Sequence, residues 1–162
     1  MTERTDALII GAGPAGLMAA EALLGAGRRV ILAEAMPTPG RKLLMAGKSG
    51  LNITKAEPPD RFLAAYGVAA PWLGPILRFG SDAVQDWARG LGQAVFTGSS
   101  GRVFPVAMKA SPLLRAWLMR LGDAGLDLRT RWRWVGIEGT TAIFATPEGE
   151  RGCAGRIAGM AC

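Results

Sequence analysis

The 162-residue sequence contains no histidine. For this chain alone, that absence excludes Ser-His-Asp and Cys-His nucleophile systems, histidine general bases and histidine-ligated metal sites. If the protein carries out redox chemistry, a bound cofactor must therefore supply it. The remaining residues single out no catalytic side chain and suggest no metal site.

Cysteine is scarce, and long apolar runs are missing. The two cysteines, Cys153 and Cys162, have no Cys-x-x-Cys spacing, so they suggest neither a disulfide framework nor a zinc site, and they fit a reducing cytoplasm. No stretch reaches the ~20 apolar residues of a membrane span. A secretory signal is also disfavoured, because Asp6 precedes the apolar N-terminal run and Pro14 interrupts it. We expect a cytoplasmic protein without a membrane partner.

The charge is strongly basic, and it comes mostly from arginine. The net charge is +6, and the densest arginine group is Arg129, Arg131 and Arg133. These arginines alternate with Leu128, Thr130, Trp132 and Trp134. Such a period of two favours the solvated face of a strand over a nucleic-acid site, and an anionic cofactor would account for part of the basic excess. We therefore expect no nucleic-acid partner.

The N-terminal segment carries a complete dinucleotide fingerprint. An apolar strand at residues 7–10 leads into Gly11-x-Gly13-x-x-Gly16, a helical pattern follows, and a second strand at 29–33 ends at Glu34. Gly11 allows a tight turn, Gly13 lets the backbone approach a pyrophosphate, and Gly16 lets the helix pack close to the sheet. Glu34 can accept hydrogen bonds from ribose hydroxyls. The alternative is an ordinary glycine-rich turn, which the register of strand, helix and acidic residue disfavours.

Later segments predict a mixture of helices and strands. Residues 36–59 form a long connection, and loops of this length inside a domain are usually functional or disordered. Ser81 is the expected N-cap of a helix that runs to about Leu91. Further helices are expected at 60–66, at 71–79 and from Ser111-Pro112 to 122–125, and strands at 94–97, 102–106, 126–130, 131–137 and 142–146.

The C-terminal residues break this pattern. The last two expected strands form a hairpin, after which a third strand would be expected. Residues 150–162 instead consist of small residues with no clear period. We therefore divide the chain into the N-terminal part of a nucleotide-binding domain at 1–149 and an atypical tail at 150–162.

Three blocks resemble a known family, the bacterial NAD(P)/FAD-dependent oxidoreductases of the aminoacetone oxidase-like FAD-binding type. The blocks are residues 11–16 with Glu34, residues 40–54, and residues 98–105 with 109–111. The similarity covers roughly residues 5–149. It implies an α/β fold, a Rossmann-like FAD-binding domain of the glutathione-reductase type, incomplete here, with a β-hairpin or meander near the C-terminus.

The resemblance also implies the cofactor and its contacts. FAD is the expected cofactor, with NAD(P)H as a candidate reductant, and the substrate would be a small molecule of unknown identity. The pyrophosphate and ribose contacts would come from the fingerprint, two basic residues would lie along the cofactor, and a glycine-rich loop would lie near the flavin. The cofactor-binding residues expected on this basis are Gly11, Ala12, Gly13, Pro14, Ala15, Gly16, Glu34, Arg41, Lys42, Gly47 and Asn52.

The leading hypothesis is an FAD-binding oxidoreductase or the N-terminal part of one. The alternatives are a non-catalytic truncated remnant that binds a nucleotide weakly and an NAD(H)-binding dehydrogenase. Family members are much longer, so the early elements should be left with exposed apolar surface, which would permit self-association. Candidates for that surface are Leu17, Leu24, Trp132 and Trp134.

Overall fold

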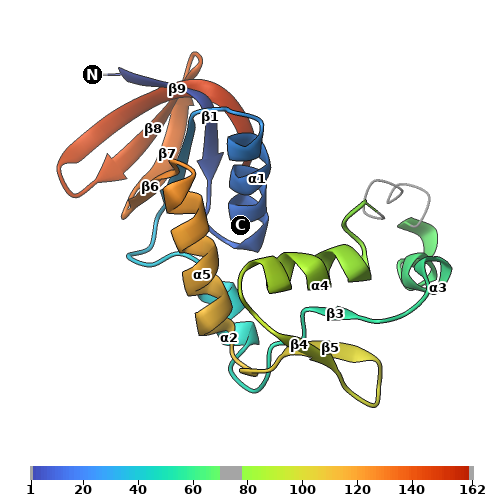
Figure 1. Ribbon diagram of the computed structural model, residues 1–162. Helices are drawn as coiled ribbons and strands as arrows, with labels where there is room; N and C mark the ends of the chain where they lie inside the picture. The colour runs from blue at the N-terminus through green and yellow to red at the C-terminus, as the bar shows by residue number, and fades with distance from the viewer. Residues whose placement is uncertain (1, 70–77, 161–162) are drawn as a thin grey trace. The chain divides into compact units, whose positions relative to one another are not determined.

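The computed structural model describes residues 2–69 and 78–160, and it divides the chain into two compact units (Figure 1). The first unit comprises Met1–Leu43 and Leu118–Cys162, and the second comprises Leu44–Trp117. Within the described ranges, no helix is long and apolar enough to cross a membrane.

A six-stranded sheet forms the centre of the first unit, in the order β6-β2-β1-β9-β8-β7. The strands β6, β2, β1 and β9 run parallel to one another, whereas β9, β8 and β7 form an antiparallel meander. This is the mostly parallel α/β sheet with a C-terminal hairpin that the sequence predicts. The strand bounds are β1 Thr2–Ile10, β2 Val30–Glu34, β6 Asp127–Thr130, β7 Arg133–Glu138, β8 Thr141–Thr146 and β9 Gly149–Met160.

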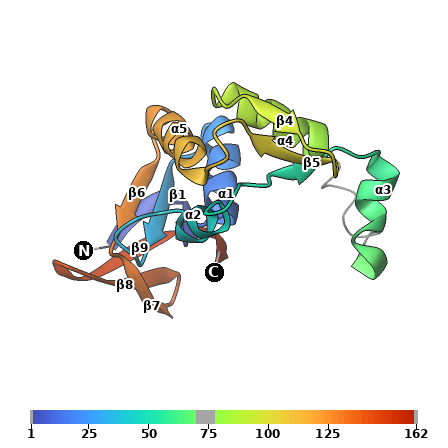
Figure 2. The ribbon, with the colours of Figure 1, turned by 90° about the horizontal axis from the view of Figure 1, so that it is seen from below.

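The two faces of this sheet are covered differently. Helix α1 (Pro14–Gly25) contacts β1 and β2 and buries Leu17 and Ala20 (Figures 1 and 2). Successive strand side chains point to opposite faces, so Leu8 faces away from the α1 side. The cluster on that far face consists of Leu8, Ile31, Ala33, Ala142, Phe144 and Cys153, with Ile10, Trp132 and Trp134 packed against it. Burial on both faces explains why β1 and β2 are continuous apolar runs.

The expectation that residues 150–162 lack a strand is wrong. Strand β9 spans Gly149–Met160 and lies between β8 and β1, so it is the third strand of the meander and also a parallel strand of the main sheet. Small residues are favoured here by neighbouring strands, since a Cβ at Gly152 would lie 2.9 Å from Thr141 Cγ2. The expected exposure of Leu17 is also wrong, because it is fully buried, and Trp132 and Trp134 are half-buried.

The arginine group at 129–133 is divided between two strands, β6 and β7, as the expected strands at 126–130 and 131–137 imply. Strand β6 ends at Thr130, and Arg131 adopts a left-handed backbone conformation with φ of 61°. Arg129 is not simply solvated. Its guanidinium donates hydrogen bonds to the carboxylates of Glu3 and Asp127 and lies 4.6 Å from the centre of the Trp132 ring.

The second unit is built around a three-stranded antiparallel sheet in the order β3-β5-β4, comprising β3 Thr54–Lys55, β5 Arg102–Pro105 and β4 Val95–Thr97. It also contains α3 (Pro59–Ala64) and α4 (Ser81–Gly90). The N-cap of α4 is Gly80 rather than Ser81, whose buried hydroxyl instead lies 3.5 Å from Gln85 Nε2. The helix expected at 71–79 falls mostly outside the described residues.

Two helices span the boundary between the units, α2 (Arg41–Ala46) and α5 (Ala110–Asp123). In the second unit, the α4 residue Trp87 packs edge-to-face on Trp117 of α5, with ring centroids 4.8 Å apart. In the first unit, Arg120 of α5 forms an ion pair with Glu21 of α1, with an N–O distance of 2.7 Å.

Candidate nucleotide-binding site

The loop between β1 and α1 is shaped by two glycines that the fold itself requires. Gly11 has φ of 99°, a conformation that favours glycine, and its N–H donates to the Ala33 carbonyl oxygen at 2.7 Å. A Cβ at Gly16 would overlap the carbonyl oxygen of Gly11. The first glycine thus turns the chain off β1, and the third lets α1 begin directly against that turn.

Gly13 differs from both, because nothing in the protein's own packing requires a glycine there. Its φ is −77°, which any residue can adopt, and a Cβ built on it meets no heavy atom of the described chain within 4 Å. Gly13 is the N-cap of α1. The missing side chain therefore leaves open space at the start of this helix.

The start of α1 is suited to an anion. The first turn reads Pro14-Ala15-Gly16-Leu17, with no acidic side chain to neutralise the positive end of the helix dipole. The first N–H groups of a helix have no intrahelical acceptor, and Pro14 at the first position has no N–H to leave unpaired. Exposed Ala15 and the open space at Gly13 leave this end accessible to a phosphate.

Glu34 connects the end of β2 to the glycine loop. Its Oε2 accepts a hydrogen bond from the Ala12 N–H at 2.9 Å, and its Oε1 accepts one from the Met36 N–H at 2.8 Å. Each carboxylate oxygen can accept more than one hydrogen bond, so these contacts leave capacity for ribose hydroxyls. The sequence indicated only the ribose role. The structure shows that Glu34 also holds the loop against β2.

The basic pair Arg41 and Lys42 belongs to the same unit as the loop. Both are exposed at the start of α2. The preceding residue, Gly40, has φ of 67°, and its N–H donates to the Ala12 carbonyl oxygen at 2.8 Å. This hydrogen bond connects the entry of α2 directly to the fingerprint loop. Sequence reasoning missed Gly40, although a glycine just before a basic pair was a usable signal.

Gly47 and Asn52 lie in the second unit. Gly47 is buried, and a Cβ there would lie 2.5 Å from Ala110 Cβ, so this glycine permits a close approach to the start of α5. Asn52 is exposed.

The loop between α2 and β3 pairs both with β5 and with the segment that follows it. The Leu51 N–H donates to the Met108 carbonyl oxygen at 3.1 Å, and the Ile53 N–H donates to that of Val103 at 3.0 Å. Two separate sequence blocks, 40–54 and 98–111, thus meet in one structure. Met108 has φ of 57°, which is rare for a residue with a long side chain. Strained residues of this kind occur often at ligand-binding sites.

The parallel sheet, the glycine turn into α1 and the carboxylate that ends β2 together define a Rossmann-type α/β domain. Residues 5–154 match the HI0933-like protein Rossmann domain, and the chain belongs to that family. The match extends beyond residue 149 into β9, farther than the resemblance seen in the sequence.

Comparison with individual proteins gives a close local match. The chain is 50% identical over 52 residues to the ribosomal RNA dihydrouridine synthase of Escherichia coli (strain K12), which corresponds to 32% of this chain and 13% of that protein. The chain therefore spans only a small part of the length of this relative.

Solved structures share the fold. A flavocytochrome c3 fumarate reductase is similar with a TM-score of 0.72 and 20% identity, over 96% of this chain and 33% of the other. A 3-ketosteroid-delta4-(5alpha)-dehydrogenase from Rhodococcus jostii RHA1 is similar with a TM-score of 0.69 and 12% identity, over 96% of this chain and 45% of the other. The chain thus spans less than half of either solved chain.

Proposed function

We propose that the chain binds FAD at the β1–α1 loop and serves a flavin-dependent oxidoreductase reaction. The observation that carries this proposal is Gly13, which stands at the N-terminus of α1 in an ordinary conformation with open space where a side chain would be. A close approach by the cofactor's pyrophosphate accounts for that glycine, whereas the protein's own packing does not.

The residues present suit the pyrophosphate and the ribose of FAD. The first N–H groups of α1 would bind the pyrophosphate, and Glu34, already held by Ala12 and Met36, would accept the ribose hydroxyls. Arg41 and Lys42 add positive charge beside the loop. When bound, the flavin would supply hydride and electron transfer. This chemistry requires no histidine, and the sequence contains none.

Several sources support FAD over NAD(H). The sequence resembles a flavoprotein family, and the similar solved structures include a flavocytochrome and an FAD-dependent halogenase. The narrower assignment to the aminoacetone oxidase-like type, and NAD(P)H as the reductant, belong to the same proposal. A remnant that binds no nucleotide and an NAD(H) dehydrogenase are the alternatives that an experiment must distinguish.

The decisive experiment compares valine substitutions of the glycines at the two ends of α1, the N-cap Gly13 and the last residue Gly25. Gly13→Val should abolish FAD binding, measured by calorimetry, without lowering the unfolding temperature of the unliganded protein. Gly25→Val is the matched control, because a Cβ there also meets nothing of the described residues within 4 Å but lies at the far end of the helix. Undiminished FAD binding by Gly13→Val would refute the proposed site. NAD(H) binding without FAD binding would favour the dehydrogenase, and binding of neither would favour the remnant.

A second candidate concerns the substrate. The local 50% identity to a ribosomal RNA dihydrouridine synthase favours reduction of uridine in RNA as the reaction that the flavin serves. Dihydrouridine differs from uridine by two hydrogens added across one ring double bond, and a reduced flavin can donate a hydride to such a bond. The test is mass spectrometry of ribosomal RNA incubated with the FAD-loaded chain and a reductant. A gain of two hydrogens per modified uridine supports this candidate, and unchanged RNA contradicts it.

A further inference from the structure

The sheet of the second unit carries two stacked aromatic rings, one exposed and one half-buried. Phe96 of β4 and Phe104 of β5 are directly opposed in the antiparallel register, with ring centroids 5.8 Å apart and ring planes inclined by 28°. Phe96 is 43% exposed, and Val106 just beyond β5 is 62% exposed. Large apolar side chains grouped at a surface indicate a contact site more often than isolated ones do.

The two faces of this sheet have different roles. Val103 and Pro105 alternate with Phe104 along β5 and are fully buried, and α4 contacts β3 and β4. Because strand side chains alternate, Arg102 and Phe104 lie on the opposite, outer face. Lys55 of β3 pairs directly with Arg102 and shares that face. The outer face therefore combines two stacked aromatic rings with two cations.

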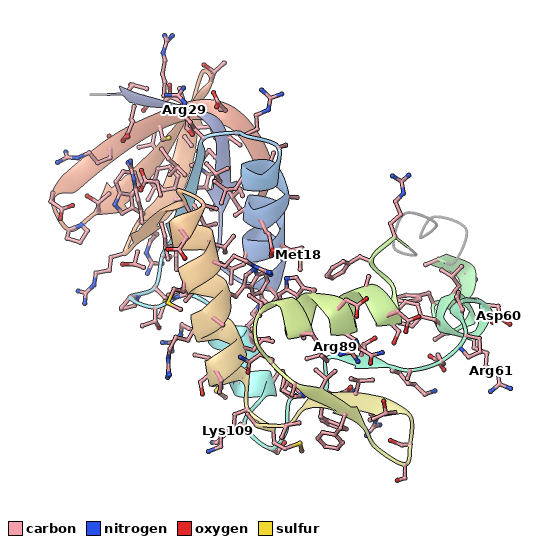
Figure 3. The ribbon with its side chains drawn as sticks, viewed as in Figure 1. Met18, Arg29, Asp60, Arg61, Arg89 and Lys109 are labelled. Atoms are coloured by element: carbon pink, nitrogen blue, oxygen red, sulfur yellow. The ribbon has the colours of Figure 1, made fainter. Side chains whose placement is uncertain are left out.

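The stretch of sequence that contains β4 and β5 is basic. Between Asp86 and Asp123 the sequence contains no acidic residue, while its basic residues there are Arg89, Arg102, Lys109, Arg115 and Arg120. Arg102 is exposed, and so is Lys109, which follows β5 (Figure 3). Three of the basic residues form ion pairs with carboxylates: Lys55 with Glu57 at 2.8 Å, Arg89 with Asp86 at 2.8 Å, and Arg120 with Glu21 at 2.7 Å. The outer face therefore takes its positive charge from Arg102. A partner for this face should therefore be anionic and should present flat rings.

The hairpin that carries the rings is held in shape by its own turn. The Gly98 N–H donates to the Arg102 carbonyl oxygen at 2.8 Å, and the Gly101 N–H donates to that of Gly98 at 2.9 Å. Gly101 has φ of 79°, as tight hairpin turns of this length require. A platform with this internal bonding loses little conformational freedom when a partner binds.

We propose that this face, formed by Phe96, Phe104, Arg102 and Lys55, binds a single-stranded segment of RNA. Bases would stack on the exposed ring of Phe96 and on the accessible part of the half-buried Phe104 ring, and Arg102 would contact the phosphates. The choice of RNA rests on the second candidate function, uridine reduction. The aromatic and basic geometry of the face is independent of it. The sequence-based expectation of no nucleic-acid partner concerned different residues, the arginines at 129–133.

The test is binding of a fluorescently labelled oligouridine to the full 162-residue chain, followed by anisotropy at fixed salt. Phe96→Ala should weaken binding roughly tenfold, because stacking of one base is typically worth ~1–3 kcal/mol, and Phe96→Tyr should restore it. Arg102→Gln should also weaken binding and should reduce its salt dependence. The matched controls are Ile137→Ala and Arg133→Gln, exposed apolar and basic residues on β7 in the other unit, and both should bind as the wild type does.

The outcomes separate this proposal from the proposed FAD site. FAD binding by Phe96→Ala should equal that of the wild type, so loss of RNA binding alone assigns the effect to the platform. If the chain binds no FAD but its RNA affinity still depends on Phe96, the platform stands and the flavin proposal fails. Absence of oligouridine binding, equal binding by Phe96→Ala and wild type, or an equal Phe96→Ala effect on duplex RNA would overturn the platform. Equal affinity for oligothymidine would overturn the choice of RNA as the partner.

Discussion

Strands β1 and β9 are neighbours in one sheet, yet their sequences look nothing alike. Residues 7–9 of β1 are an apolar run, and all of them are buried. Strand β9 begins Gly-Glu-Arg-Gly-Cys-Ala-Gly and shows neither an apolar run nor a period of two. The side chains of β1 predict a strand by themselves, whereas β9 forms a strand because it pairs with the strands on either side of it.

The register between these strands explains what β9 must contain. Arg4 pairs with Ala154, and Ala7 pairs with Arg156, so two residues of β1 lie opposite the single residue Gly155. Such a β-bulge crowds the partner strand. A Cβ at Gly155 would lie 2.8 Å from Thr5 Cγ2 and 3.1 Å from the Thr5 carbonyl oxygen. The glycines of β9 interrupt the apolar pattern that would predict a strand, and the same glycines are required for β9 to pack beside its neighbouring strands.

The sharpest test of glycine as a packing requirement is Gly16 in the fingerprint loop. In Gly16→Ala the new methyl group would overlap the carbonyl oxygen of Gly11, which is backbone and cannot rotate away. We expect the free energy of unfolding to fall by about 3 kcal/mol, at the upper end of overpacking effects. Urea unfolding followed by circular dichroism measures this loss.

The control lies in the same helix. Gly25→Ala adds a methyl group that meets nothing within 4 Å in the described structure, and alanine favours helix by ~1 kcal/mol over glycine in a helix interior. It should therefore leave stability unchanged or raise it slightly. Equal losses in the two variants would show that the contact at Gly11 is relieved at little cost.

A smaller effect is expected on β9. Gly155→Ala should lower the free energy of unfolding by about 1–2 kcal/mol, because the threonine side chain can yield in part while its backbone cannot. Adding Thr5→Ser removes Cγ2 but keeps the hydroxyl that donates to the Arg29 carbonyl oxygen at 2.8 Å, so it should recover part of the loss. Gly136→Ala on β7, where a Cβ meets nothing within 4 Å among described atoms, is the control. A Gly155→Ala protein as stable as this control would refute the packing account of β9.

Local patterns predicted most of the fold. The β1–α1–β2 segment, the two strands β4 and β5 and the β7–β8 hairpin were all predicted from the sequence, because their apolar runs and turn residues are adjacent in the chain. The strand β9 was missed because its two partners, β1 and β8, determine it through long-range pairing. The left-handed conformation of Arg131 was missed for a similar reason, since its N–H donates to the distant Met36 carbonyl oxygen at 3.2 Å.

The sequence also predicted some features of the candidate site but not its hydrogen bonds. Glycine spacing identifies the loop, and a carboxylate at the end of β2 identifies Glu34. The sequence could not show that Glu34 binds the N–H groups of Ala12 and Met36, because main-chain donors leave no trace in residue types. The glycine spacing assigned different roles to Gly13 and Gly16, and the structure shows that an added Cβ would meet open space at Gly13 and backbone at Gly16.

The smallest expected effect tests whether an ion pair with β6, in addition to packing against β9, helps hold the start of β1 in the sheet. Glu3 pairs in register with Cys153 of β9, and its carboxylate accepts hydrogen bonds from Arg129 of β6 at 2.5 and 2.7 Å. These hydrogen bonds hold the pKa of Glu3 below its ordinary value of 4.5. A lowered pKa in the folded state means that the pair stabilises the protein above about pH 4.5 and that this stability is lost as the pH falls through the folded pKa.

Glu3→Gln should therefore lower the free energy of unfolding at pH 7 by less than ~1 kcal/mol, since the Glu3 side chain is about half exposed and water screens the pair. In acid the variant and the wild type should converge, because protonated Glu3 no longer attracts Arg129. Urea unfolding between pH 7 and pH 3 measures both effects, with Glu138→Gln, an exposed glutamate at the end of β7, as the control. A deficit in Glu3→Gln that stayed constant down to pH 3 would mean that Glu3 contributes by packing. The β1–β9 edge would then depend on packing alone, as the threonine and glycine contacts along it already suggest.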